Sequence, residues 1–256
     1  GGVVDREQGG DPVRIGEVHL EVRQQQRRRR HVVDGADDCV RLAAEGQEAQ
    51  KRGTPAWLGE GVAQIFAVNW ANSKESKKKK AQYQAMIYEA VKAGQSFPFA
   101  EFTNITNAHN LQNVADNQLK SATTYAQAFS VMQYMVEVKW QAFLAFLENC
   151  RAENFKKGFA GGRISELYSV QEKAFQDAFT VPLAQVEDYW KKHVLTGTEK
   201  ELKRAPENYY WCGEYCILKR DLTAAEERFK LAIEGAPQKG EGYLGMGRLA
   251  LMKNDN

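Results

Sequence analysis

One carboxylate stands out because of the residues around it. Glu60 lies in the run TPAWLGEGVAQIF (54–66), between two glycines. Thr54 can cap a helix, Pro55 suits its first position, and apolar residues then recur at helical spacing, so the run predicts a helix. Glu60 lies away from the stripe of Leu58, Val62 and Ile65. It is therefore either a solvated helix residue or one ligand of a metal site whose other ligands lie elsewhere.

Cysteine and histidine are the other residues that could bind a metal. The four cysteines show neither zinc-finger spacing nor a dense disulfide framework: they are Cys39, Cys150, Cys212 and Cys216. Cys212 and Cys216 lie four residues apart on one face of a predicted helix, with no histidine nearby. This geometry favours packing over metal or redox chemistry. Two of the four histidines, His109 and His193, stand alone and are predicted to be surface or packing residues.

The elements that would position these residues are helices. Helical periodicity or composition is found in the following segments: 54–66, 81–94, 125–138, 140–150, 169–179 and 182–195. The lysine-rich run at 73–80 is predicted to be a solvated helix start, and the segment 96–102 a connection broken by proline. Strand-like alternation is almost lacking, so we predict a mainly α fold.

Residues 1–52 differ in composition from the rest of the chain. They contain none of the 27 aromatic residues, and they carry nine arginines but one lysine. A segment so poor in large apolar side chains cannot bury enough surface to offset its loss of entropy on ordering. Two interpretations stand: a disordered basic arm, or sequence that is not native to the protein, such as a frame error upstream of Thr54.

Residues 204–256 contain an internal repeat. Tyr209 and Gly213 recur 34 residues later as Tyr243 and Gly247. The residue types resemble the tetratricopeptide repeat, with one full repeat and the first helix of another. On this alignment the packing positions are Tyr209, Gly213, Ala225, Phe229, Ala232, Pro237, Tyr243 and Gly247. The resemblance implies a peptide or protein partner for this segment.

The middle of the chain, residues 53–200, resembles the peptidase MA-like (gluzincin, thermolysin-like) zinc metallopeptidases, of which it matches the C-terminal helical part. The match rests on W-L-x-E-G-x-A, present here from Trp57 to Ala63, with Gln64 where many relatives carry a second acid. The segments 125–135 and 174–194 resemble later helices of that class. The resemblance implies zinc as cofactor, Glu60 as the third zinc ligand and Tyr125 as an electrophilic helper. For Tyr125, a plain core position is the alternative.

The chemistry of that class needs an H-E-x-x-H motif upstream of Glu60, which supplies two zinc ligands and the general base. The four histidines, His19, His31, His109 and His193, do not form it. We therefore predict a metalloendopeptidase-like domain that is inactive as written. The alternative is a non-catalytic interaction module of the tetratricopeptide type, and a helical fragment that associates with a missing half is a third hypothesis.

Composition narrows the possible partners. The net charge of +2 gives no reason to expect nucleic acid or an anionic membrane as a partner. No apolar run approaches the roughly 20 residues that span a bilayer. No export signal is recognised, although relatives in the resembled class are often exported, so the compartment is left open.

Overall fold

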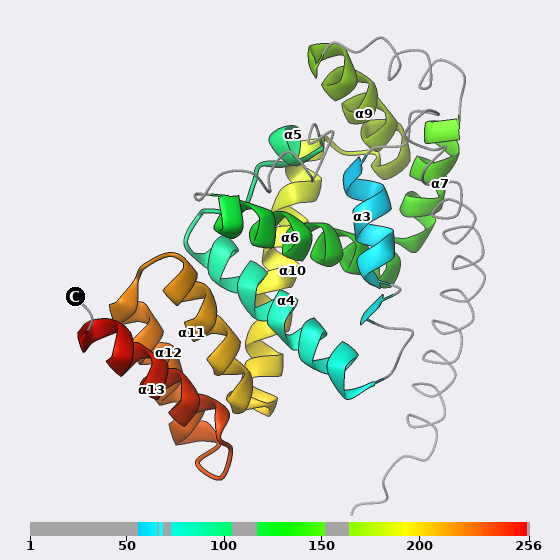
Figure 1. Cartoon of the computed structure of the whole chain (residues 1–256). Coiled ribbons are helices and arrows are strands. Elements are labelled where there is room, and N and C mark those ends of the chain that lie inside the picture. The colour runs from blue at the N-terminus through cyan, green and yellow to red at the C-terminus, as the bar shows by residue number, and fades with distance from the viewer. Residues whose placement is uncertain (1–55, 66, 69–72, 104–116, 152–163, 255–256) are drawn as a thin grey trace, which may run out of the picture. The chain divides into compact units, whose positions relative to one another are not determined.

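The computed structural model describes residues 56–65, 67–68, 73–103, 117–151 and 164–254 (Figure 1). Within these ranges the chain is built from helices and contains no strand, which confirms the predicted mainly α fold. All of these residues belong to one compact unit, residues 41–256. The predicted arm, residues 1–52, lies outside the described ranges. No helix in those ranges is long and apolar enough to cross a membrane.

Helix α4 (Lys74–Lys92) shows how the local sequence sets its two ends. The side chain of Ser73 accepts a hydrogen bond from the backbone N–H of Ser76 at 3.0 Å, which satisfies a free donor of the first turn. Residues 77–79 are exposed, as predicted for a solvated helix start. The helix ends before Gly94, whose φ of 66° is easily adopted only without a side chain.

The other helices before residue 205 are α3 (Ala56–Ile65), α5 (Phe99–Phe102), α6 (Asn117–Val138), α7 (Trp140–Arg151), α9 (Ile164–Phe179) and α10 (Leu183–Arg204). Both α6 and α10 are longer than the apolar periodicity indicated. The added segment of α10 (TGTEKELKR) is rich in Glu, Lys, Leu and Arg, which favour helix without an apolar pattern. The predicted connection at 96–102 contains α5, with Pro98 just before its first residue.

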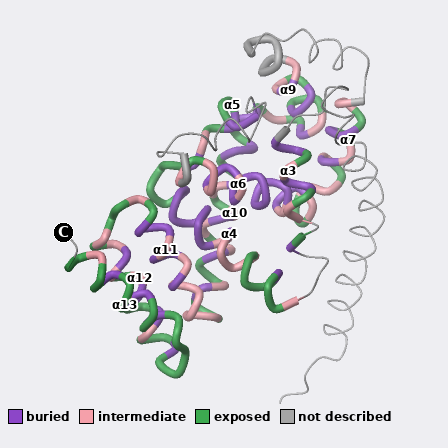
Figure 2. The backbone as a smooth tube through the Cα atoms, in the orientation of Figure 1, coloured by how far each residue is buried: buried purple, intermediate pink, exposed green. Residues whose placement is uncertain are grey.

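Helix α6 lies at the centre of this region and packs against α3, α4, α7 and α10 (Figure 1). Much of it is drawn as buried in Figure 2. Its fully buried side chains include Ala126, Ala128, Phe129, Met132 and Met135. Because one long helix supplies so much of the core, the helices that cross it are fixed relative to one another.

The C-terminal elements are η3 (Pro206–Asn208), α11 (Tyr209–Leu218), α12 (Leu222–Gly235) and α13 (Glu241–Asn254). Helix α11 packs on α4 as well as on α12 and α13. The turn before α12 places Arg220 at a φ of 60°. Asp221 then caps α12, because its side chain accepts a hydrogen bond from the backbone N–H of Ala224 at 3.0 Å.

Candidate functional site

The two glycines beside Glu60 have different surroundings. A Cβ atom on Gly61 would lie 2.3 Å from Cγ of Met132 and 2.8 Å from the carbonyl oxygen of Ala128, both on α6. A side chain at this position would therefore push α3 away from α6. A Cβ on Gly59 would meet nothing within 4 Å. Gly61 is thus required for close packing of the two helices, and Gly59 is not.

Glu60 is half-buried on α3 and lies close enough to Tyr83 of α4 to influence its pKa. Tyr83 of α4 donates a hydrogen bond to Oε1 of Gln64, one turn after Glu60, at 2.9 Å. Burial, with smaller contributions from Tyr125 and Glu60, raises the pKa of Tyr83 to about 12. Both residues singled out by the metallopeptidase resemblance, Glu60 and Tyr125, therefore contribute to the electrostatic surroundings of Tyr83.

This group of Glu60, Gln64, Tyr83 and Tyr125 is called the Glu60 cluster. With a pKa of about 12, Tyr83 stays protonated at neutral pH and acts as a hydrogen-bond donor. Glu60 is the only carboxylate among the four residues and is the sole member suited to bind a divalent cation. The cluster can orient a polar group by hydrogen bonds, and it offers a metal one protein ligand.

A catalytic zinc takes three protein ligands. Among the described residues, no group of three or more His, Cys, Asp or Glu side chains is placed to hold a metal ion. Three histidines, His19, His31 and His109, lie outside the described ranges. The fourth, His193, is on α10, with its ring 5.3 Å from that of Tyr134. The described residues therefore do not make up the ligand set of a catalytic zinc.

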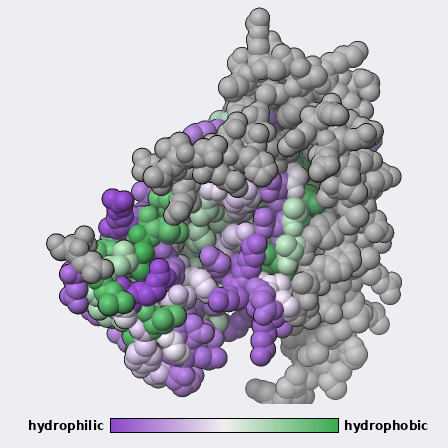
Figure 3. Space-filling view, in the orientation of Figure 1, coloured by the Kyte–Doolittle hydropathy of each residue, from purple (hydrophilic) through white to green (hydrophobic). Residues whose placement is uncertain are grey.

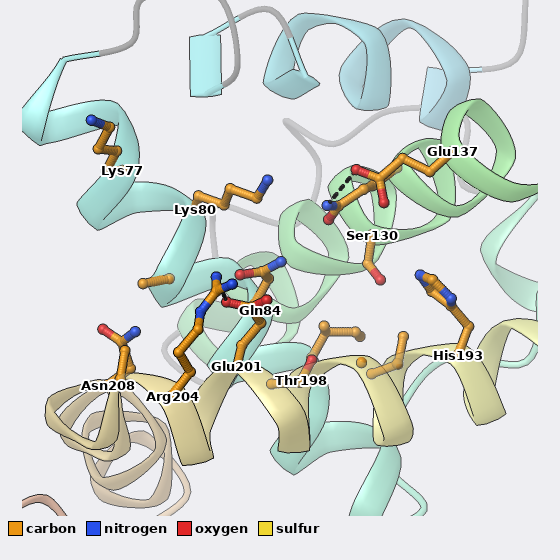
Figure 4. A pocket seen from close by; sticks show the side chains of 16 residues that line it. Lys77, Lys80, Gln84, Ser130, Glu137, His193, Thr198, Glu201, Arg204 and Asn208 are labelled. Carbon is orange, nitrogen blue, oxygen red and sulfur yellow. Dashed lines mark hydrogen bonds and ion pairs between the residues drawn. The ribbon is translucent and has the colours of Figure 1, made fainter. Parts of the chain in front are cut away.

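A cleft of about 610 Å³ opens between α4, α6 and α10 (Figure 4). Its charged and titratable lining residues are Lys77, Lys80, Glu137, His193, Glu201 and Arg204. Arg204 forms an ion pair with Glu201, and Glu137 accepts a hydrogen bond from Gln133 at 3.0 Å. Both basic and acidic groups are present in this lining, so it does not define a ligand of one charge.

Trp57, which begins the W-L-x-E-G-x-A match, anchors a buried network that the sequence did not reveal. Its indole Nε1 donates a hydrogen bond to Oε1 of Gln171 at 3.1 Å, and Nε2 of Gln171 donates to the carbonyl of Thr103 at 2.8 Å. The indole lies against three aromatic rings, those of Phe102, Phe146 and Phe175. Gln171 stands three and four residues before buried Ala174 and Phe175, and this spacing was the available signal.

Helices α11, α12 and α13 contain the predicted repeat and pack around Phe229. These three helices are called the hairpin. A Cβ on Gly213 would lie 2.3 Å from Cε1 of Phe229, and a Cβ on Gly245 would lie 2.3 Å from its Cδ1. Phe229 is thus held between α11 and α13 at positions where both helices lack a side chain. Ala225 and Ala232 are buried on the same helix as Phe229, whereas Tyr209 is half-buried and Pro237 exposed.

The second half of the repeat differs from the expectation. Tyr243 is 51% exposed, and a Cβ on Gly247 would meet nothing within 4 Å. Helix α13 instead packs through Gly242, Gly245 and Leu249, which are buried. The physical reason is that α12 and α11 cover one side of α13, while no described helix covers the side that carries Tyr243 and Gly247.

An ion pair joins the hairpin to α4, one of the helices before residue 205. Arg228 of α12 donates from Nε to Oε1 of Glu89 at 2.6 Å and from Nη2 to Oε2 at 3.2 Å, and Glu89 on α4 is buried. The nearby Cys212 and Cys216 are buried and free, in agreement with a packing role. Burial raises the pKa of the Cys212 thiol well above its usual value, so this thiol stays protonated.

Comparison with known proteins gives one family match. A family model described as a protein of unknown function (DUF1570) matches residues 41–155. The match spans α3 to α7 and therefore includes Glu60, Gly61 and Tyr125. Searches of curated proteins and of solved structures found no match. The likeness to gluzincins and to the tetratricopeptide repeat remains a hypothesis.

Proposed function

We propose that this chain is a non-catalytic protein-binding module whose C-terminal hairpin, of the tetratricopeptide type, binds a partner. The supporting observation is the outward face of α13. Tyr243, Leu244 and Leu251 on this helix are 51%, 59% and 66% exposed. They account for three of the exposed large apolar side chains of the described residues, and they share one helix with the open glycine Gly247.

Clustering of this kind is typical of a binding surface, because single exposed apolar residues are common but grouped ones are selected against in monomers. Hydrophobic residues gather over the C-terminal helices in the space-filling view of Figure 3. The hairpin beneath is held in place by Phe229 between two glycines and by the Arg228–Glu89 ion pair. A firmly positioned helix loses little freedom on binding, which favours affinity.

Loss of binding by a surface variant tests this function. The full chain is used to capture proteins from its source cells, beside a variant that combines Leu244→Glu with Leu251→Glu. The control replaces Leu218, which is 43% exposed on α11, by Glu. We expect a protein captured by the wild type and the control but lost from the double variant. Equal capture by all three chains, or no capture by any, would contradict the proposal.

A second candidate function, a zinc-dependent metalloendopeptidase, is favoured by the Glu60 cluster. Glu60 and Tyr125 come from helices 56–65 and 117–138, and both contribute to the raised pKa of Tyr83, which supports this candidate. Against activity of this chain stands its sequence, which contains no H-E-x-x-H motif in 256 residues. Without that motif the class lacks two ligands and its general base.

Metal content separates the two candidates. The full chain and its Glu60→Ala variant are purified with added zinc, and zinc is measured per chain by mass spectrometry, together with peptide hydrolysis with and without a chelator. We expect no stoichiometric zinc and no chelator-sensitive hydrolysis. About one zinc per chain that is lost in the variant would establish the peptidase function instead.

A further inference from the structure

The cleft between α4, α6 and α10 has a polar lining that neither the Glu60 cluster nor the binding surface on α13 uses. Its volume of about 610 Å³ is that of a small-molecule site. Its neutral polar side chains include the amides of Gln84, Gln133 and Asn208 and the hydroxyl of Thr198. Amides and hydroxyls both donate and accept hydrogen bonds, so this lining fits a ligand that carries donors and acceptors of its own.

The lysine run at the start of α4 supplies the cleft with an ammonium group. Nζ of Lys78 lies 5.3 Å from the ring centroid of Trp211, and Nζ of Lys79 lies 5.5 Å from that of Tyr83. Lys80 is half-buried, lines the cleft and extends from α4 toward α6 (Figure 4). Its ammonium has no ion pair or hydrogen bond with the residues that the structure describes. A partly desolvated cation without a counter-charge favours an anionic group on a ligand.

The last turn of α6 supplies a carboxylate on another wall of the cleft. Oε1 of Glu137 accepts a hydrogen bond from Nε2 of Gln133 at 3.0 Å. Within the described ranges no cation pairs with Glu137, and Lys80 does not reach it. The cleft therefore presents an ammonium and a carboxylate that are separate from each other and open to a ligand.

The other charged groups of the lining do not change this pattern. Arg204 and Glu201 form an ion pair and neutralise each other. Lys77 is exposed, and in Figure 4 its side chain points away from α6. A ligand with one charge would be attracted by either Lys80 or Glu137 and repelled by the other. A ligand with both charges can pair with both groups.

We propose that this cleft binds a small zwitterionic molecule, whose carboxylate pairs with Lys80 and whose ammonium pairs with Glu137. Free amino acids and short peptides with free ends share this chemistry. The apolar part of the lining includes the buried side chains of Ile87 and Val194. Beside them a Cβ on Gly197 would meet nothing within 4 Å, so the cavity has room for a small side chain of the ligand.

The test uses two probes, alanine and trialanine with free ends, and isothermal titration calorimetry of the full chain. Trialanine is also supplied with an acetylated N-terminus or an amidated C-terminus, which removes one charge at a time. Lys80→Gln and Glu137→Gln remove the two protein charges. Lys74→Gln is the control, because Lys74 is exposed on α4 and does not line the cleft.

We expect the wild type and Lys74→Gln to bind trialanine with free ends. Blocking either end should weaken binding by roughly 10-fold or more, the loss expected for one hydrogen bond between charged groups. Lys80→Gln should weaken binding of the free-ended peptide similarly and should no longer distinguish an amidated from a free C-terminus. Glu137→Gln should no longer distinguish an acetylated from a free N-terminus.

A larger side chain at Gly197 tests the location independently of charge. Gly197→Met should abolish binding by filling the cavity. Gly59→Met is its matched control, since both glycines lie in helices and have nothing within 4 Å of an added Cβ. Circular dichroism checks that both variants remain helical. Equal affinity for alanine and trialanine would identify the amino acid as the recognised unit, and tighter binding of trialanine would identify the peptide.

Three results would overturn the inference. The first is the absence of binding of both probes to the wild type. The second is binding that Gly197→Met leaves unchanged, which would place the ligand elsewhere. The third is equal affinity for free-ended and blocked trialanine, which would exclude pairing with Lys80 and Glu137. None of these results bears on α13, where the capture experiment with Leu244→Glu and Leu251→Glu decides the protein-binding function.

Discussion

The helices from α3 to α10 are held together by bulky side chains from distant parts of the sequence, whereas the hairpin from α11 to α13 is built around one phenylalanine and two glycines. In the first region Trp57 reaches Gln171 across 114 residues, and Nε1 of Trp190 donates a hydrogen bond to Ser130. In the second region Phe229 meets Gly213 and Gly245, each 16 residues away. The hairpin is therefore encoded locally and repeated, while the first region depends on long-range contacts.

Removing the ring at the centre of the hairpin should have the largest effect. Phe229 is fully buried, so Phe229→Ala should lower the free energy of unfolding by about 3–5 kcal/mol through lost burial and a cavity. Leu231→Ala on the same helix is the control, since Leu231 is 38% exposed and should cost less than about 1 kcal/mol. Urea unfolding followed by circular dichroism measures both. Similar losses for the two variants would contradict this account of the hairpin.

The ion pair between the two regions offers the next largest effect. Arg228→Ala leaves the buried carboxylate of Glu89 without its partner, and we expect a loss of about 3 kcal/mol. The double change Glu89→Leu with Arg228→Met removes both charges and should cost less than Arg228→Ala alone. Unfolding free energies of the two variants test this. If the double variant were less stable than Arg228→Ala, the ion pair would contribute more to the free energy of unfolding than the neutralisation of the Glu89 charge.

Two glycines of α3 differ in their surroundings: Gly61 packs closely against α6, and Gly59 faces open space. Gly61→Ala should destabilise the protein by about 1–3 kcal/mol, because the added Cβ meets the backbone of α6. Gly59→Ala has open space and should stabilise it by up to about 1 kcal/mol, since alanine favours helix. Thermal unfolding of the two variants provides the measurement. A stabilising Gly61→Ala would show that α3 and α6 do not approach so closely.

The smallest effect concerns an exposed ion pair within the hairpin. Lys230 and Lys253 lower the pKa of Glu226 to about 2. A lowered pKa in the folded state adds stability that is present above the unfolded value of 4.5 and is lost as the pH falls toward 2. Lys253→Ala should raise the pKa of Glu226, as read by NMR titration at low salt. An unchanged pKa of Glu226 would show that Lys253 does not lower it.

Apolar periodicity predicted the helices well where side chains alternate between core and solvent. Leu58 and Val62 on α3 are buried, as are Phe129 and Met132 on α6. The same reasoning missed the polar extension of α10, because helix-favouring residues without an apolar stripe leave no periodic signal. It also missed Gln171, because a polar residue is not counted in an apolar stripe even where its spacing from buried Ala174 and Phe175 places it on the same face.

The candidate site was predictable only in part, for a related reason. The cap, the proline and the apolar spacing of the run 54–66 predicted α3, but its hydrogen bond from Tyr83 depends on how α4 packs and could not be predicted from the run itself. In the hairpin, the residue types that resemble the tetratricopeptide repeat indicated that Phe229 packs beside Gly213, and the structure places the two in contact. The 34-residue period did not reveal that Gly245, rather than Gly247, meets Phe229. Period alone gives the equivalence of two positions and does not say which neighbour is present at each.

The central claim is that binding occurs on α13 and not at the Glu60 cluster. Hydrogen exchange of the full chain, measured by mass spectrometry with and without the protein that the wild type captures, compares the two places directly. We predict slower exchange in residues 241–254 and unchanged exchange in residues 56–65 when that protein is present. Slower exchange in residues 56–65 with none in 241–254 would contradict the claim.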